Sequence, residues 1–139
     1  MSMRDVLLPL FVQVTLTFVL LFWMAAVRTR AFAHGLKPAD IALRQPNWPP
    51  EVSKIANAFH NQLEVPLLFY VLTILAWDTH HAGTLFVTLA WLFVALRVVH
   101  AIIHVTTNQV RQRGLAYIAG VIVLALMWGL YMLDILIGT

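Results

Sequence analysis

The sequence contains no cysteine among its 139 residues, and only 11% of its residues are charged. The absence of cysteine excludes a disulfide framework, a thiolate metal site and a cysteine nucleophile, so any thiol chemistry must use a thiol from a ligand. The low charge, against about 25% in soluble chains, argues against an ordinary soluble enzyme or a disordered polyelectrolyte. Hydrophobic residues make up 61% of the chain and the mean hydropathy is +0.83, which favours an integral membrane protein.

Four apolar stretches predict membrane-spanning helices. Each is long enough to cross about 30 Å of hydrocarbon at about 1.5 Å rise per residue. The first and last lack the polar stripe that every helix of a soluble bundle shows. We therefore predict an all-α fold, a single domain over residues 1–139 that forms a left-handed bundle of four antiparallel transmembrane helices. The predicted helices cover residues 6–27, 55–77, 84–105 and 115–137.

Basic residues gather in the connections on one side of this predicted bundle. They are Arg28, Arg30, Lys37, Arg44 and Lys54 in the connection 28–54, and Arg111 and Arg113 in the connection 107–113. The opposite side carries only Arg4. By the positive-inside rule, both basic connections face the cytoplasm and both termini lie outside. The pI of 9.8 is thereby explained by topology, and we expect membrane lipid rather than nucleic acid as a partner.

Polar side chains interrupt the second and third apolar stretches at helical spacing. They are Asn57, His60, Asn61 and Glu64 on the second, and Arg97, His100, His104, Asn108 and Arg111 on the third. The first group spans a sector of about 100°, and the second a sector of about 80° provided that its helix continues beyond residue 105. Because polar groups inside a membrane are costly unless they are paired or face a cavity, we interpret both groups as the walls of a site.

The two stripes can meet at one depth. Glu64 and Arg97 lie about 14 Å and about 15 Å from the cytoplasmic ends of their helices, which are antiparallel neighbours. An ion pair between them would offset the cost of burying each charge. Pro66 frees the carbonyl of Gln62, and we expect it to kink the second helix beside Glu64.

Two other interpretations of these residues stay open. Polar stripes can hold membrane helices together through interhelical hydrogen bonds without any ligand. His60 with Glu64, and His100 with His104, have the four-residue spacing of metal or haem ligands. Ligands alone would not account for the arginines and asparagines, so we expect no metal at the site.

The run from Ile55 to Tyr70, IANAFHNQLEVPLLFY, followed by Arg97-x-x-His100-x-x-x-His104 and Arg111, resembles the MAPEG family, the membrane-associated proteins in eicosanoid and glutathione metabolism. The Asn-x-x-Glu pair with a nearby proline is the most specific part. The chain is similar to bacterial-type members related to microsomal glutathione transferases. The resemblance implies a homotrimer, here in a bacterial inner membrane, with glutathione bound as co-substrate between protomers near the cytoplasmic face.

The resemblance also implies roles for single residues. Asn61 and Glu64 stand where the family contacts glutathione, and Arg111 stands where an arginine stabilises the glutathione thiolate. Arg28 or Arg30 would meet a carboxylate of the tripeptide. A guanidinium suits a thiolate because it stays protonated while it favours the ionised, nucleophilic form of the thiol.

The chain also departs from the glutathione-using eicosanoid enzymes. Asn57 stands where they have an arginine, and His100 and His104 stand where they have tyrosines, whereas Arg97 matches an arginine of theirs. Loss of a bidentate partner for a carboxylate should weaken glutathione binding.

The leading hypothesis is a glutathione-dependent transferase or peroxidase that acts on lipophilic electrophiles from the bilayer, with Arg111 as the catalytic residue. The predicted binding residues are Arg30, Asn57, His60, Asn61, Glu64, Arg97, His100 and His104. One alternative, favoured by Asn57, is a non-catalytic protein that binds lipids or other hydrophobic small molecules on the same fold. The other is a haem- or metal-binding membrane protein that uses His60, His100 and His104.

Overall fold

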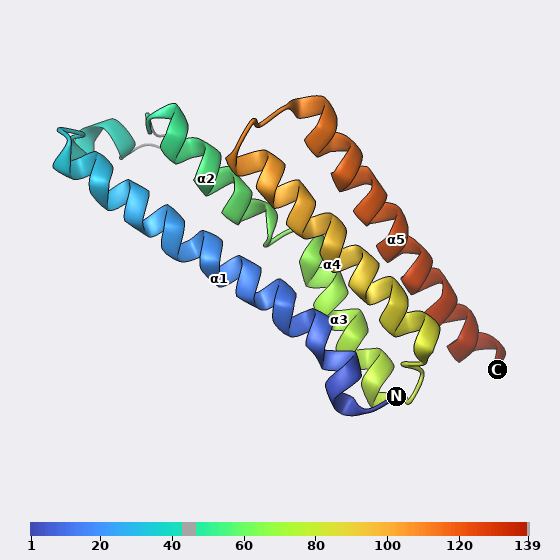
Figure 1. The fold of residues 1–139 in the computed structure, drawn as a ribbon. Helices are drawn as coiled ribbons and strands as arrows, with labels where there is room; N and C mark the ends of the chain where they lie inside the picture. The colour runs from blue at the N-terminus through green and yellow to red at the C-terminus, as the bar shows by residue number, and fades with distance from the viewer. Residues whose placement is uncertain (43–46, 139) are drawn as a thin grey trace.

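The computed structural model describes residues 1–42 and 47–138, and in this part of the chain helices joined by short links are the regular structure, with no strand (Figure 1). Its elements are α1 (Met3–Ala33), the short 3-10 helix η1 (Pro38–Ile41), α2 (Pro50–Asn61), α3 (Val65–Asp78), α4 (Thr84–Val105) and α5 (Val110–Ile137). Four units are long and apolar enough to cross a membrane, and α2 with α3 forms the second of them. The predicted all-α membrane fold is thus confirmed. Arg44, counted above among the basic residues, lies outside the described residues.

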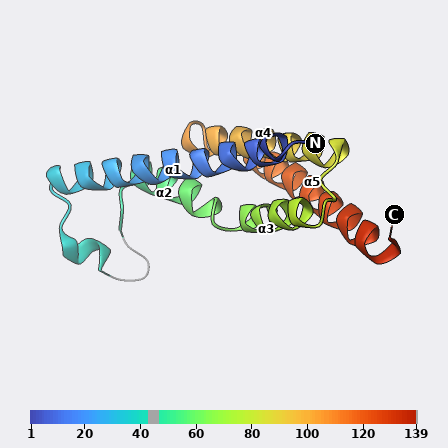
Figure 2. The same ribbon diagram turned by 90° about the horizontal axis from the view of Figure 1, so that it is seen from below.

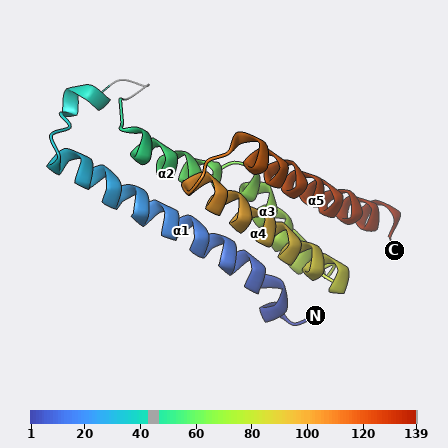
Figure 3. The same ribbon diagram turned by 45° about the horizontal axis from the view of Figure 1, so that its top comes forward.

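The membrane-spanning units run alternately up and down, so both termini lie at one end of the bundle (Figure 1). Helix α4 lies between α1 and α5, and Figure 3 shows the same arrangement from another side. It packs against α1, α2 and α5, and 44% of its most apolar window is buried, against 22% for α1 and for α5. Helix α4 is therefore the centre of the bundle.

Three of the predicted helix ranges differ from the structure at their ends. Helix α4 covers the residues expected for it, but α1 extends beyond residues 6–27 and α5 begins at Val110 rather than at residue 115. Ser2 and Asp5 form a reciprocal capping box that starts α1 outside the apolar run. At the other end of α1, Gly35 adopts a φ of +101° just past the C-cap. Hydrophobicity marks the membrane-embedded part of a helix, whereas caps decide where the helix ends.

The second apolar stretch is divided rather than continuous. Helix α2 ends at Asn61 and α3 begins at Val65, joined by a non-helical link that Figure 2 shows clearly. Pro66 lies in the first turn of α3, where its missing N–H is tolerated, and it cannot donate to the carbonyl of Gln62. The kink that we expected beside Glu64 is therefore a complete break in the helix.

The largest apolar core lies in the half of the bundle that holds the termini. We call this the terminal half. Its buried residues are Val6, Phe69, Leu72, Ala76, Phe86, Val87, Ala90, Phe93, Val94, Leu124 and Met127. The rings of Phe69 and Phe93 stack with their centroids 4.8 Å apart. The other half, which we call the polar half, contains the helix break and most of the buried polar residues, whereas the buried Thr73 lies on α3.

Candidate functional site

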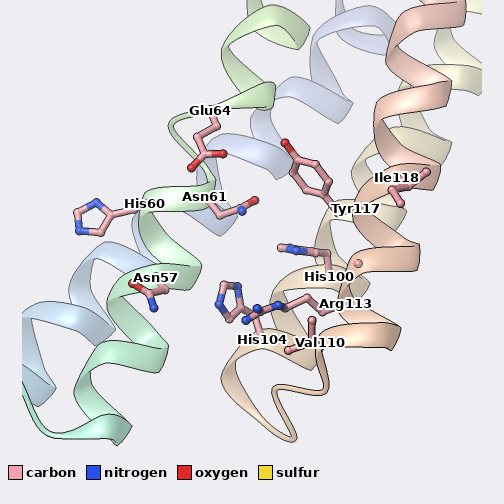
Figure 4. Close-up of a pocket in the computed structure, with 11 residues that line it drawn as sticks. Asn57, His60, Asn61, Glu64, His100, His104, Val110, Arg113, Tyr117 and Ile118 are labelled. Carbon is pink, nitrogen blue, oxygen red and sulfur yellow. The ribbon is translucent and has the colours of Figure 1, made fainter.

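A cavity of about 500 Å³ lies in the polar half between α2, α4 and α5 (Figure 4). It is lined by Asn57, His60, Asn61 and Glu64 from α2 and the break, by His100 and His104 from α4, and by Val110, Arg113, Gly114, Tyr117 and Ile118 from α5. Six of the residues predicted from the two polar stripes therefore line one cavity. Antiparallel packing of α2 along α4 brings them together, as expected.

The α2 side of the cavity is open. Asn57, His60 and Glu64 are exposed, and Asn61 is half-buried at the end of the helix. The side chains of Asn57, His60 and Glu64 make no hydrogen bond or ion pair with the described residues. This wall thus presents the amide of Asn57, an imidazole and a carboxylate that have no partner among the described residues and can bind a ligand.

The α4 side is buried. His100 and His104 are 2% and 5% exposed, and their rings meet edge to face with centroids 5.5 Å apart. The Nδ1 atom of each ring is buried without a hydrogen-bond partner in the part of the chain that the structure describes. These two nitrogens are buried polar atoms without a partner in the described chain, which is costly, on rings that line the cavity.

Arg97 lies behind the cavity wall and is 1% exposed. Its Nη2 donates to the side-chain and backbone oxygens of Asn61 and, at 3.2 Å, to Oε1 of Gln62. The predicted ion pair with Glu64 is wrong, since these two residues, both of them described, form no ion pair within 4 Å. The break explains the difference, because the end of α2 presents free carbonyl and amide oxygens to Arg97 while the chain turns Glu64 outward.

Gln62 joins Arg97 to α1 through a second set of hydrogen bonds. Gln13 on α1 donates from Nε2 to Oε1 of Gln62 at 2.8 Å, and Gln62 donates from Nε2 to the carbonyl of Ala58 at 3.0 Å. Both glutamines are fully buried. This buried layer holds the broken helix against α1 and α4.

The predicted position of Arg111 is also wrong. Helix α4 ends at Val105 and the chain turns through Asn108, which has a φ of +52°, so Arg111 lies in the first turn of α5. It is exposed and does not line the cavity. Arg113 lines it instead, and its Nη1 donates to Oδ1 of Asn108.

Arg113 and Tyr117 are absent from the predicted site, although a signal for them was present. Both fall on the helical stripe of α5 that continues through the buried Gly120, Leu124 and Met127. At about 100° per residue, a side chain two positions away points about 200° round the helix. The stripe therefore selects Arg113 over Arg111.

Arg30 lies elsewhere in this chain. It borders a separate cavity of about 270 Å³ beside the start of α2, together with His34 and Glu51. The guanidinium of the neighbouring Arg28 lies 4.9 Å from the centroid of the Trp48 ring. Neither arginine borders the polar cavity of its own chain.

No group of three or more His, Asp or Glu side chains within residues 1–42 and 47–138 is arranged to hold a metal ion. The ring of His60 on α2 points away from His100 and His104 (Figure 4). The three histidines proposed as metal ligands thus do not form a ligand set.

These features define the class of the protein as a four-helix integral membrane protein with a polar cavity in one half of its bundle. The model of the MAPEG family matches residues 6–133, so the chain belongs to the MAPEG family. The match includes every residue that lines the cavity. No curated protein and no solved structure matches the chain.

Proposed function

We propose that this membrane protein binds glutathione in the polar cavity and uses its thiol against lipophilic electrophiles, as a transferase or a peroxidase. The observation that carries the proposal is the convergence of polar side chains from α2, α4 and α5 on one cavity in an apolar bundle. A volume of about 500 Å³ is typical of small-molecule sites. Membership in the MAPEG family favours glutathione as the ligand.

The groups around the cavity complement those of glutathione. Glu64 suits the ammonium group of the tripeptide. Arg113, His100 and His104 supply donors for its carboxylates and its sulfur. The ligand would thus lie across the cavity between the α2 wall and the wall formed by α4 and α5.

Arg113 takes the catalytic role that was expected of Arg111. The hydrogen bond to Asn108 orients its guanidinium, which stays protonated and stabilises the thiolate after the thiol proton has passed to water. The thiolate sulfur forms a bond to the electrophilic carbon, and the leaving group departs with its bonding electron pair. With a hydroperoxide as substrate, two glutathione molecules are oxidised to the disulfide while the hydroperoxide is reduced to an alcohol and water.

The exposed polar residues favour an assembly of several copies. Asn57, His60 and Glu64 lie on the open side of the membrane-spanning unit, where contact with lipid would be costly. We therefore infer that a neighbouring copy covers them in a homotrimer, the assembly that the family resemblance implies. Arg30 of that copy would meet a carboxylate of glutathione. The basic connections favour a cytoplasmic position for this end of the bundle, in a bacterial inner membrane.

The test is the ultraviolet absorbance of the thiolate when glutathione is added to the purified protein in detergent. We expect a thiolate signal with the parent protein and its loss in Arg113→Ala. Arg111→Ala is the matched control, since it removes the same charge from an exposed position two residues away and should retain the signal. An absent signal in the parent, or an unchanged signal in Arg113→Ala, would overturn the proposal.

A second candidate function follows from Asn57, which replaces an arginine of the glutathione-using enzymes. In that case the protein binds lipids or other hydrophobic small molecules without turnover. It predicts that such molecules raise the melting temperature while glutathione neither binds nor reacts. The thiolate measurement separates the two functions.

A further inference from the structure

Arg97 is a buried cation whose hydrogen bonds go to neutral oxygens. Its Nη2 donates to three of them, Oδ1 and the backbone oxygen of Asn61 and Oε1 of Gln62. The aromatic ring of Tyr117 lies 5.9 Å from the guanidinium carbon, on the side of α5. The backbone oxygen of Asn61 belongs to the last turn of α2, where the helix dipole favours a cation.

The contact with Arg97 fixes which end of the Asn61 amide faces the ligand. Oδ1 is engaged by Arg97, and Nδ2 has no acceptor among the described residues. Rotating the amide by 180° would set its NH₂ group against the NH₂ group of Arg97, and two donors cannot bond each other. Asn61 therefore presents N–H donors to the cavity (Figure 4).

The layer behind Asn61 prevents Arg97 from moving away. Oε1 of Gln62 also accepts from Gln13, and Nε2 of Gln62 is bound to the carbonyl of Ala58. Helix α1, the end of α2 and α4 thus hold the guanidinium in place together. Through Nη2 the guanidinium is bound to oxygens at the end of α2, while its Nε has no partner among the described residues.

We propose that Arg97 is a positioning residue that sets the polarity of Asn61, so that this part of the cavity accepts a carboxylate or another hydrogen-bond acceptor and rejects a donor. The ligand class rests on the proposed function, in which the carboxylate belongs to glutathione. The contact between Arg97 and Asn61 stands independently of it. Arg97 itself touches no ligand and acts through Asn61.

The experiment compares Asn61→Asp with Asn61→Ala in the purified full-length protein. Aspartate keeps an oxygen for Arg97 and adds a charge to the pair, but replaces the donor with an acceptor. We expect Asn61→Asp to melt at or above the parent temperature and to bind glutathione at least about tenfold more weakly, because two carboxylates then face each other. Asn61→Ala should lower both the melting temperature and the affinity for glutathione. Asn57→Asp, which adds the same charge away from Arg97, is the control and should not raise the melting temperature.

A second pair of variants separates positioning from a structural role. Arg97→Lys retains a cation that can donate to Oδ1, whereas Arg97→Met does not. We expect KM for glutathione to rise from the parent to Arg97→Lys and further to Arg97→Met, with kcat at saturation changed by less than about twofold. A structural role alone would reduce the yield of folded protein without changing KM.

The outcomes separate the positioning role of Arg97 from the proposed glutathione function. If Asn61→Asp binds glutathione as the parent does, or melts no higher than Asn61→Ala, the positioning role is overturned. If the parent binds no glutathione, the proposed function and the carboxylate assignment fail together. The order of melting temperatures then still decides whether Arg97 holds Oδ1 of Asn61.

Discussion

The terminal half and the polar half of the bundle share α4 but use it differently. In the terminal half, Phe93 stacks on Phe69 and the surrounding apolar residues are packed closely. In the polar half, about one turn further along α4, Arg97 begins a series that continues with His100 and His104 beside a cavity of about 500 Å³. The terminal half is mainly apolar and has one buried imidazole nitrogen without a partner, Nδ1 of His81, whereas beside the polar cavity Nδ1 of His100, Nδ1 of His104 and Nε of Arg97 have none among the described residues. If the proposed function is right, α4 supports packing with one segment and ligand binding with the next.

The largest effect on stability should come from Phe93→Ala in the terminal half. Phe93 is fully buried, and its loss would leave a cavity against Phe69. We expect a loss of about 3 kcal/mol in the free energy of unfolding, at the low end for a change from phenylalanine to alanine. In a membrane, burial from lipid adds little hydrophobic stabilisation, so the loss comes mainly from packing. The measurement is unfolding in detergent, followed by circular dichroism.

Phe22→Ala is the matched control for that change. Phe22 is 68% exposed on α1, on a surface that would face lipid, and its removal should alter stability much less. Similar losses for the two variants would mean that the terminal half does not carry the stability of the bundle. The proposed difference between the two halves would then be wrong.

A smaller loss is expected at the border between the halves. Gln62→Leu removes the acceptor of Gln13 and the donor to the carbonyl of Ala58, both of them buried. We expect a loss of about 1.5 kcal/mol, near the upper limit for hydrogen bonds between membrane helices. Gln13→Leu should cost less, since Oε1 of Gln13 is already unpaired in the described structure. Equal melting temperatures for Gln62→Leu and the parent would contradict a stabilising role of this layer.

The fold was predictable because hydrophobicity is a strong signal over long segments. It identified all four membrane-spanning units and the range of α4, residues 84–105. It could not place the ends of α1 and α5, which depend on capping by Ser2 and on the turn at Asn108. Local backbone chemistry, rather than the apolar pattern, decides such boundaries.

The site was predictable where one helix carried a whole stripe. Helical spacing on α2 and on α4 placed six residues at one cavity. The prediction failed where the backbone leaves the helix. It placed Arg111 on a continuation of α4, which ends at Val105, and it paired Glu64 with Arg97 although a break separates Glu64 from α2. Periodicity carries no information across a turn, so Arg113 could be found from the stripe of α5 itself but not by extending the stripe of α4.

A gain in stability is expected at the contact between α4 and α5. A Cβ atom at Gly120 would meet Leu96 and Phe93 at 3.9 Å, which is ordinary van der Waals contact. Gly120→Ala should therefore stabilise the protein by about 0.5–1 kcal/mol through helix propensity and added contact. Gly129→Ala, with nothing within 4 Å of its Cβ, should gain only the propensity part. A lower melting temperature for Gly120→Ala would show that the helices need a closer approach here.

The smallest effect on stability, and the sharpest test of the two halves, should come from His104→Leu. The imidazole of His104 is buried with Nδ1 unpaired, and leucine fills a similar volume without a polar atom. Since an unsatisfied buried atom opposes folding, we expect the free energy of unfolding to stay within about 0.5 kcal/mol of the parent or to rise. Glutathione binding should weaken by about tenfold, because a cavity donor or acceptor is lost. Titration of glutathione alongside the unfolding measurement checks both expectations. A stability loss as large as that of Phe93→Ala, with glutathione binding intact, would mean that the histidines of α4 hold the fold together rather than receive a ligand.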